Sequence, residues 1–275
     1  MQGETMVASS TAETATGISE IVRRGAAAPQ DKIVVTDLQK SFDLPGNGVL
    51  QVLGGISLTI AEGKTVAIVG PSGCGKSTLV KILAGFERPD GGAILIDGGV
   101  RNGPSPKGIL ISQHGSVFPW RTVRQNLMFG LTDGSEAEKA TLADRYIALV
   151  GLKGFENSYP RELSGGMLKR VEVARALVVK PDILYMDEPF SALDALTSLK
   201  LRMELLRILE RERHTVVLIT HDIEEAIHLA DQVVVLSTRP TTIRATFDVP
   251  LRHPRKMSSP QAQSLRESIL HELGL

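Results

Sequence analysis

Residues 70–78 read GPSGCGKST, and this glycine-rich segment constrains the fold more than any other feature of the chain. The apolar run Thr65 to Val69 precedes it, and apolar residues at helical spacing follow it: Leu79, Val80, Ile82 and Leu83. A strand that leads through such a segment into a helix is the context of the G-x-x-x-x-G-K-[ST] pattern. A plain glycine-rich turn is the alternative, and the flanking strand and helix weigh against it. The segment therefore predicts a phosphate-binding loop.

Every residue of this loop is a candidate nucleotide ligand, because glycines let backbone N–H groups converge on phosphate oxygens and the next helix adds its positive end. The candidates are Gly70, Pro71, Ser72, Gly73, Cys74, Gly75, Lys76, Ser77 and Thr78. We expect Lys76 to reach the β- and γ-phosphates, and the Ser77 hydroxyl to coordinate Mg²⁺. Cys74 is the only cysteine of the chain. We interpret it as a small residue that the loop tolerates, in preference to a redox sensor.

Short apolar runs alternate with helical patterns along the chain, which is typical of βαβ units around a mostly parallel sheet. The runs are Thr65 to Val69, Ile109 to Ile111, Ile183 to Met186, Val216 to Ile219 and Val233 to Leu236. From about 114 to 170 the strand signal lapses, which predicts a helical insertion. A closing amphipathic helix is expected over about 260–273. After Asp194, residues Leu199, Met203 and Leu206 share one helical face, and Asp222 begins another helix.

Polar side chains follow two of the predicted strands at their carboxyl ends, where open α/β sheets bind ligands. Asp187 and Glu188 follow one strand, and His221 follows Val216 to Thr220. We expect Asp187 to hold Mg²⁺ and Glu188 to orient or deprotonate the water that attacks the γ-phosphorus. His221 is placed to hydrogen-bond the γ-phosphate or that water. The alternatives are a solvated strand end for the acids and a structural role for the histidine.

The composition limits the possible partners. Lysine plus arginine equals aspartate plus glutamate at 31 each, so no global field would draw the chain to nucleic acid or an anionic membrane. No stretch approaches the apolar length that spans a bilayer, and the first thirty residues lack the apolar core of a secretory signal. The sequence therefore predicts a cytoplasmic protein with a disordered tail over residues 1–31 and one folded unit over 32–275.

The segment Leu163 to Met167 reads LSGGM, and it decides between the classes of phosphate-loop protein. It resembles the signature of ABC proteins, whose commonest form is LSGGQ. The other motifs of that family occur in order: Phe42 where an aromatic side chain stacks on adenine, Gln113 where a glutamine links the Mg²⁺ site to the transport partner, and Ser191 to Asp194 where a loop forms the dimer interface. The resemblance runs from about Ile33 to the C-terminus. A small-molecule kinase would not explain residues 163–166 or Asp194.

The resemblance implies a fold, a ligand set and an assembly. The fold is an α/β P-loop NTPase (RecA-like) core with an antiparallel β subdomain and an inserted helical subdomain. ATP and Mg²⁺ would be bound, with Ser77, Gln113 and Asp187 at the metal, and with Lys76, Gln113, Glu188 and His221 as catalytic residues. Ser164, Gly165 and Gly166 would complete the ATP site of a second copy of the chain, with Asp194 in the interface of that two-fold pair.

Some positions depart from the family pattern. Met167 replaces the usual glutamine and Leu168-Lys169 the common Arg-Gln, but Ser164 and Gly166 are intact, so we expect activity to be kept. His114 stands where an acid is usual, which leaves the coupling geometry there open.

The residues Phe118-Pro119-Trp120, the LSGGM signature and residues 236–240 resemble the nitrate, sulfonate, taurine and bicarbonate importer group. This implies a subunit peripheral to the cytoplasmic face of the inner membrane, two integral membrane permease subunits and, indirectly, a solute-binding protein. Trp120, the only tryptophan, is expected either in the core or against the permease. The basic residues 252–256 are interpreted as a solvated face. A soluble ABC ATPase that remodels nucleic acid or ribosomes is the alternative.

Overall fold

The computed structural model describes residues 31–275 except 47, 114, 192 and 213. The tail predicted over residues 1–31 lies outside the described residues, apart from Asp31. That residue is the first of strand β1, one position before the expected start of the folded unit at 32. His114 and its departure from the family pattern also lie outside the described residues.

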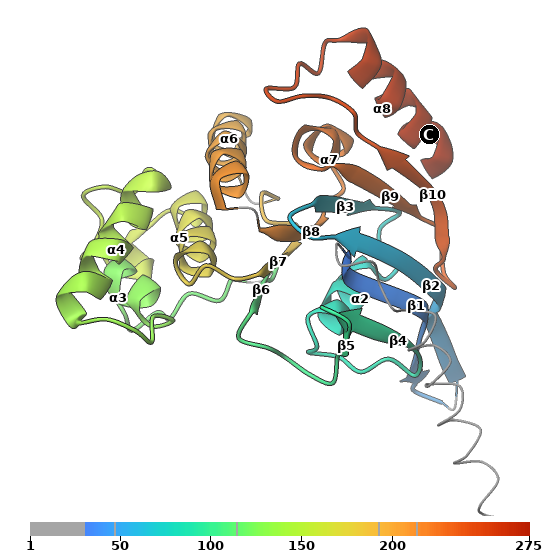
Figure 1. The fold of residues 1–275 in the computed structure, drawn as a ribbon, viewed down its shortest axis with the longest axis horizontal. Coiled ribbons are helices and arrows are strands. Elements are labelled where there is room, and N and C mark those ends of the chain that lie inside the picture. The colour runs from blue at the N-terminus through green and yellow to red at the C-terminus, as the bar shows by residue number, and fades with distance from the viewer. Residues whose placement is uncertain (1–30, 47, 114, 192, 213) are drawn as a thin grey trace, which may run out of the picture.

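A mostly parallel sheet of six strands, ordered β10-β9-β3-β8-β7-β6, forms the centre of the molecule (Figure 1). Its strands are β3 (Thr65–Val69), β6 (Gly108–Ile111), β7 (Ile183–Asp187), β8 (Thr215–Ile219), β9 (Gln232–Leu236) and β10 (Ile243–Asp248). Only β10 pairs antiparallel. Along β7, Leu184 and Met186 enter the core on one face of the sheet, while Ile183 and Tyr185 enter the core on the other. Because both faces are covered, the strands are continuously apolar, as the sequence predicts.

A second, antiparallel sheet lies beside the first in the order β2-β1-β4-β5 (Figure 1). Its strands are β1 (Asp31–Leu44), β2 (Gly48–Ala61), β4 (Gly91–Ile96) and β5 (Gly99–Val100). Helix α2 (Lys76–Leu83) packs into the core shared by the two sheets, where Leu79 and Leu83 join Ile33 of β1. The mostly parallel sheet, the antiparallel sheet and the helices confirm the fold class predicted from the sequence.

The helical insertion lies at one end of the molecule (Figure 1). It contains α3 (Val123–Met128), α4 (Glu136–Leu149), the 3₁₀ turn η1 (Pro160–Glu162) and α5 (Gly165–Val178). Helices α3 and α4 both begin with a capping box, formed by Thr122 with Gln125 and by Ser135 with Glu138. Helix α5 starts inside the predicted range 114–170 and runs beyond it. The treatment of this part as a separate subdomain stays a prediction.

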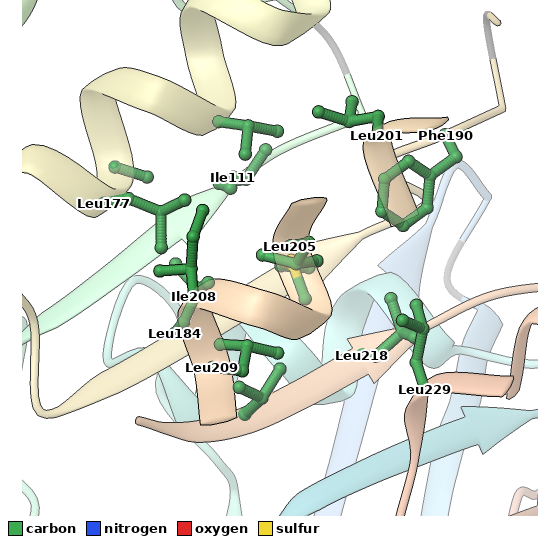
Figure 2. Packing of buried hydrophobic residues seen from close by; sticks show 14 of the residues in the cluster. Ile111, Leu177, Leu184, Phe190, Leu201, Leu205, Ile208, Leu209, Leu218 and Leu229 are labelled. Carbon is green, nitrogen blue, oxygen red and sulfur yellow. The ribbon is translucent and has the colours of Figure 1, made fainter. Parts of the chain in front are cut away.

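Helix α6 (Ala195–Glu212) buries a different face from the one that the sequence suggested. Leu205, Ile208 and Leu209 point into the core above the sheet (Figure 2). Leu199 and Met203, grouped from the sequence as the apolar face, are 47% and 45% exposed. The helix carries leucines on both sides, so helical spacing alone could not choose the face that packs.

The C-terminal part places α7 (Ile223–Leu229) and α8 (Pro260–Leu273) above the sheet (Figure 1), and α8 covers the range expected from the sequence. The basic residues 252–256 are not all solvated, which corrects the sequence-based interpretation. Arg255 is buried, and its guanidinium donates hydrogen bonds to the carbonyl groups of Ile227 and Ala230, at 2.6 Å each. It therefore satisfies carbonyl groups at the C-terminal end of α7. Within the described ranges, no helix combines the length and apolarity needed to cross a membrane.

Candidate functional site

The carboxyl ends of four neighbouring parallel strands carry the predicted nucleotide site. In sheet order these are β3, β8, β7 and β6. The phosphate loop follows β3, His221 follows β8 after one residue, Asp187 ends β7, and Gln113 follows β6 after one residue. Because parallel strands end at the same edge of the sheet, residues from distant parts of the sequence are brought to one edge.

The phosphate loop is held in a conformation that glycine makes possible. Gly75 has φ +117° and caps α2, and a Cβ there would lie 2.6 Å from a methyl group of Val52. Lys76 Nζ donates hydrogen bonds to the carbonyl groups of Gly70 and Pro71, at 2.8 and 2.9 Å. These bonds hold the ammonium group across the loop, where its charge would meet a phosphate.

Asp187 and Ser77 together offer oxygen ligands at the start of α2. Asp187 is 4% exposed, and burial raises the pKa of its carboxyl group, while a hydrogen bond from the Ser77 hydroxyl lowers it. The Asp187 Oδ1 atom is buried with no hydrogen-bond partner. A hydroxyl and a carboxylate with an unpaired oxygen are the ligands that Mg²⁺ prefers, so the residues present fit this ion.

Gln113, Glu188 and His221 converge although they come from three different strand ends. Gln113 Nε2 donates to Glu188 Oε2 at 3.3 Å, and His221 Nδ1 lies 3.5 Å from Glu188 Oε1. Glu188 has φ +50°, an unusual value for this residue type, and its N–H donates to the carbonyl group of Ile219. A backbone strained in this way is typical of functional sites that the surrounding structure holds in place.

Phe42 lies on β1, and its ring is 38% exposed, with Lys40 Nζ 5.1 Å from the ring centroid. The structure therefore leaves part of the ring free to stack on a base, as the sequence suggested for this position.

The predicted signature residues begin a helix, as expected. Ser164 caps α5, and its hydroxyl accepts a hydrogen bond from the N–H of Met167 at 3.3 Å. Gly166 packs near Leu193, and Asp194 Oδ1 accepts from the N–H of Thr197 at the start of α6. Across the part of the chain that the structure describes, no hydrogen bond or ion pair joins residues 164–166 to residues 70–78.

Lys169 is a positioning residue that the sequence did not reveal. It is 6% exposed, lies 3.0 Å from the carboxylate of Glu172 and donates to the carbonyl group of Ser112. Glu172 in turn accepts from the N–H of Ser116. This buried ion pair ties the signature helix α5 to the segment that carries Gln113. The residue types alone gave no signal of it, since a lysine three residues before a glutamate is typical of a solvated helix face.

Two further residues, Thr241 and Glu225, lie near the site but were not among its predicted residues. The Thr241 hydroxyl donates a hydrogen bond to the carbonyl group of Cys74, which fixes the loop against the β9–β10 connection. Glu225 is 5% exposed, and burial raises the pKa of its carboxyl group to about 8. Asp222 begins α7, as the sequence predicts. In the structure the Asp222 side chain alone makes the cap, by accepting from the N–H groups of Glu224 and Glu225.

Sequence comparison finds relatives over most of the chain. The family model described as ABC transporter matches residues 53–191. A Methanocaldococcus jannaschii protein named as an uncharacterized ABC transporter ATP-binding protein is 42% identical over 88% of this chain and 91% of its own length. The aliphatic sulfonates import ATP-binding protein SsuB of Bacillus cereus is 40% identical over 87% and 95%. The nitrate import ATP-binding protein NrtC of Synechococcus elongatus is 39% identical over 88% of this chain and 38% of its own length.

Structural comparison finds the same fold. A dimeric structure of a bacterial ABC transporter cassette has a TM-score of 0.73 and 28% identity, covering 80% of this chain and all of that one. A dimeric post-hydrolysis state of an ATP-binding cassette with bound ADP and Pi has a TM-score of 0.72, also at 28% identity and with the same coverage.

Proposed function

The chain belongs to the ABC transporter family as an ATP-binding and ATP-hydrolysing subunit, and we propose that it energises the import of a small anion through separate permease subunits. The observation that carries the catalytic part is the convergence of Gln113 and His221 on the Glu188 carboxylate, beside the phosphate loop. The relatives named for sulfonate and nitrate import support the choice of a small anion as cargo.

The chain's own residues suit the hydrolysis of ATP. Lys76 and the backbone N–H groups of the loop would bind the phosphates, and Phe42 would stack on the adenine. Glu188 would accept the proton of the attacking water, and its contacts with Gln113 and His221 would hold the carboxylate in position. Mg²⁺, held by Asp187, Ser77 and Gln113, would neutralise charge that develops on the phosphate oxygens.

A second copy of the chain would complete each ATP site. The positive end of α5 at Ser164 would bind an anion, and within the described residues no hydrogen bond or ion pair joins it to the phosphate loop of its own chain. Two-fold pairing would place it on the γ-phosphate held by the other copy. Hydrolysis would remove that contact, so the nucleotide state would control closure of the pair.

An exposed aromatic patch marks the side that would face the permease. We define this patch by Phe118, Trp120 and Phe129. The Phe118 ring meets that of Trp120 in a tilted arrangement with centroids 5.6 Å apart, and that of Phe129 edge to face at 4.7 Å. Arg121 and Arg175 lie over the same rings. Trp120 is 71% exposed, so the alternative role in the core is contradicted. Rigid aromatic side chains beside arginines are typical of protein interfaces, and such a contact would hold the chain at the cytoplasmic face of the membrane.

We expect Trp120→Ala to weaken the binding free energy of the chain for the permease by about 2 kcal/mol or more, which is a loss of affinity of roughly thirtyfold. Transport in proteoliposomes should fall with it, while the ATPase rate and melting temperature of the isolated chain stay the same. Phe86→Ala is the matched control, because Phe86 is 60% exposed and outside the aromatic patch. Unchanged binding to the permease in Trp120→Ala would rule out this docking side.

The proposed function is tested by reconstituting the chain with its membrane partner and candidate solute-binding proteins in liposomes. ATP turnover should rise when the permease is added, and rise again with one anion and its binding protein. Turnover that responds to ribosomes or nucleic acid, and to none of the membrane partners, would overturn the proposal in favour of the soluble alternative.

A further inference from the structure

A small cavity lies at the amino ends of β6 and β7, on the edge of the parallel sheet opposite to the nucleotide site. Its volume is about 220 Å³, and its lining includes Gly108, Ile183 and Tyr185 from these strands, together with Arg101 after β5. None of the residues assigned above to ATP or Mg²⁺ lines it. The cavity is therefore a separate feature that the proposed ATPase does not use.

Two polar atoms at this cavity are buried without a hydrogen-bond partner, and both can donate. One is the hydroxyl group of Tyr185, whose side chain is 0% exposed, and the other is Nε of Arg101. Burial raises the pKa of the Tyr185 phenol to about 12, so the hydroxyl keeps its proton at neutral pH. A buried donor left without an acceptor destabilises the folded state, so two at one cavity call for an acceptor.

The Tyr185 ring and the Arg101 guanidinium both lie close to Gly108, which has no side chain to fill the space between them. A Cβ at Gly108 would lie 3.1 Å from the Tyr185 ring and 3.8 Å from a terminal nitrogen of Arg101. That same terminal nitrogen donates to the carbonyl group of Ala84 at 2.7 Å, which fixes the guanidinium. The arginine is thus oriented by the protein while its Nε–H is left for another acceptor.

The charges at the cavity favour an anion. Three cationic side chains line it, namely Lys32, Arg101 and Lys107, against two carboxylates, Asp97 and Asp182. Lys32 lies 2.9 Å from Asp97 and 3.8 Å from Asp182, and Lys107 lies 3.5 Å from Asp182. Both carboxylates are therefore already paired with lysines, and the guanidinium of Arg101 is left as the excess positive charge.

We propose that this cavity binds a small anion with at least two oxygen acceptors, an oxyanion or a carboxylate. One oxygen would accept from the Tyr185 hydroxyl and another from Arg101 Nε–H, with Lys107 at the exposed rim. The volume of about 220 Å³ leaves room for an ion of this size.

Equilibrium dialysis with radiolabelled sulfate and, separately, radiolabelled acetate tests the proposal on the full chain. Saturating ADP is present to occupy the phosphate loop, and sodium chloride holds the ionic strength constant. We expect one probe ion per chain, with affinity lowered about tenfold or more in Tyr185→Phe and in Arg101→Lys. Arg101→Lys keeps the charge but loses the Nε–H donor. The matched control is Arg252→Lys, at an exposed arginine, which should bind as the parent chain does.

Binding that survives in Lys76→Ala and is lost in Tyr185→Phe supports the cavity as the site. Binding that is lost in Lys76→Ala instead would assign the probe to the phosphate loop and overturn the proposal. The absence of binding for both probes, or equal binding in Tyr185→Phe and the parent chain, would also overturn it. Thermal melts of each variant confirm that it is folded under the conditions of the binding measurement. Failure of this site would leave the proposed ATPase function untouched, because its readout does not involve hydrolysis.

Discussion

Glu188→Gln should lower the rate of ATP hydrolysis by roughly 10²- to 10⁴-fold, the usual contribution of a general base. Glutamine keeps the shape of the side chain and can hydrogen-bond Gln113, but it cannot accept a proton from water. ATP binding should be retained, because no hydrogen bond or ion pair joins Glu188 to the phosphate loop within the part that the structure describes. The measurements are phosphate release under saturating ATP and Mg²⁺, and equilibrium binding of ATP.

The same variant should also change the assembly state. Hydrolysis removes the γ-phosphate that would join two copies. When hydrolysis is arrested, the dimer should therefore accumulate in the presence of ATP and Mg²⁺, as measured by light scattering. Glu267→Gln, an exposed acid on α8, is the matched control and should hydrolyse ATP normally and return to the monomer. A Glu188→Gln chain that stays monomeric with ATP and hydrolyses it at the parent rate would contradict both the base and the pairing.

The strand ends were predictable from the sequence because two independent patterns agree there. Mainly apolar runs of three to five residues locate the buried strands, and a polar side chain directly after such a run must lie at the sheet edge. This places Asp187, Glu188 and His221 correctly along the chain. The contacts of Glu188 with Gln113 and His221 required the strand order, which a single sequence does not contain.

The burial of a side chain could not be predicted in this way where it depends on which other elements pack against that side chain in the fold. Helix α6 carries apolar residues on two sides, and only its place above the sheet decides that Leu205 is buried and Leu199 is not. Arg255 and Lys169 are charged, so composition favours solvent for them. In the structure each side chain is buried because it meets backbone carbonyl groups that need a donor.

A mixture of two inactive variants should regain activity if each ATP site is shared between two copies. Lys76→Ala removes the phosphate-loop cation, and Gly166→Asp places a carboxylate at the anion-binding end of α5. Each variant alone forms only defective sites, and hydrolysis should fall by roughly a hundredfold or more, as for loss of an electrostatic stabiliser. In a mixed dimer, one site combines the intact loop of the second variant with the intact signature of the first.

The expected recovery can be calculated. Random pairing in an equal mixture makes half of the dimers mixed, and each of these has one intact site out of two. If the sites turn over independently, activity per chain should return to about a quarter of the parent value.

The choice of Gly166→Asp separates loss of the site from loss of the fold. An acid in the first turn is favourable to helix α5, and the added Cβ would meet only side-chain methyl groups, of Leu193 at 3.2 Å and of Thr197 at 3.9 Å. Gln261→Asp likewise introduces an acid into the first turn of a helix, α8, and should leave hydrolysis unaltered, so it is the control for the added charge. Activity of the mixture that stays at the level of the separate variants would contradict shared, independent sites. Full ATPase activity of Gly166→Asp alone would show that the signature residues are not part of the ATP site. Recovery to about a quarter would make Ser164 to Gly166 of one copy part of the site that Lys76 forms in the other.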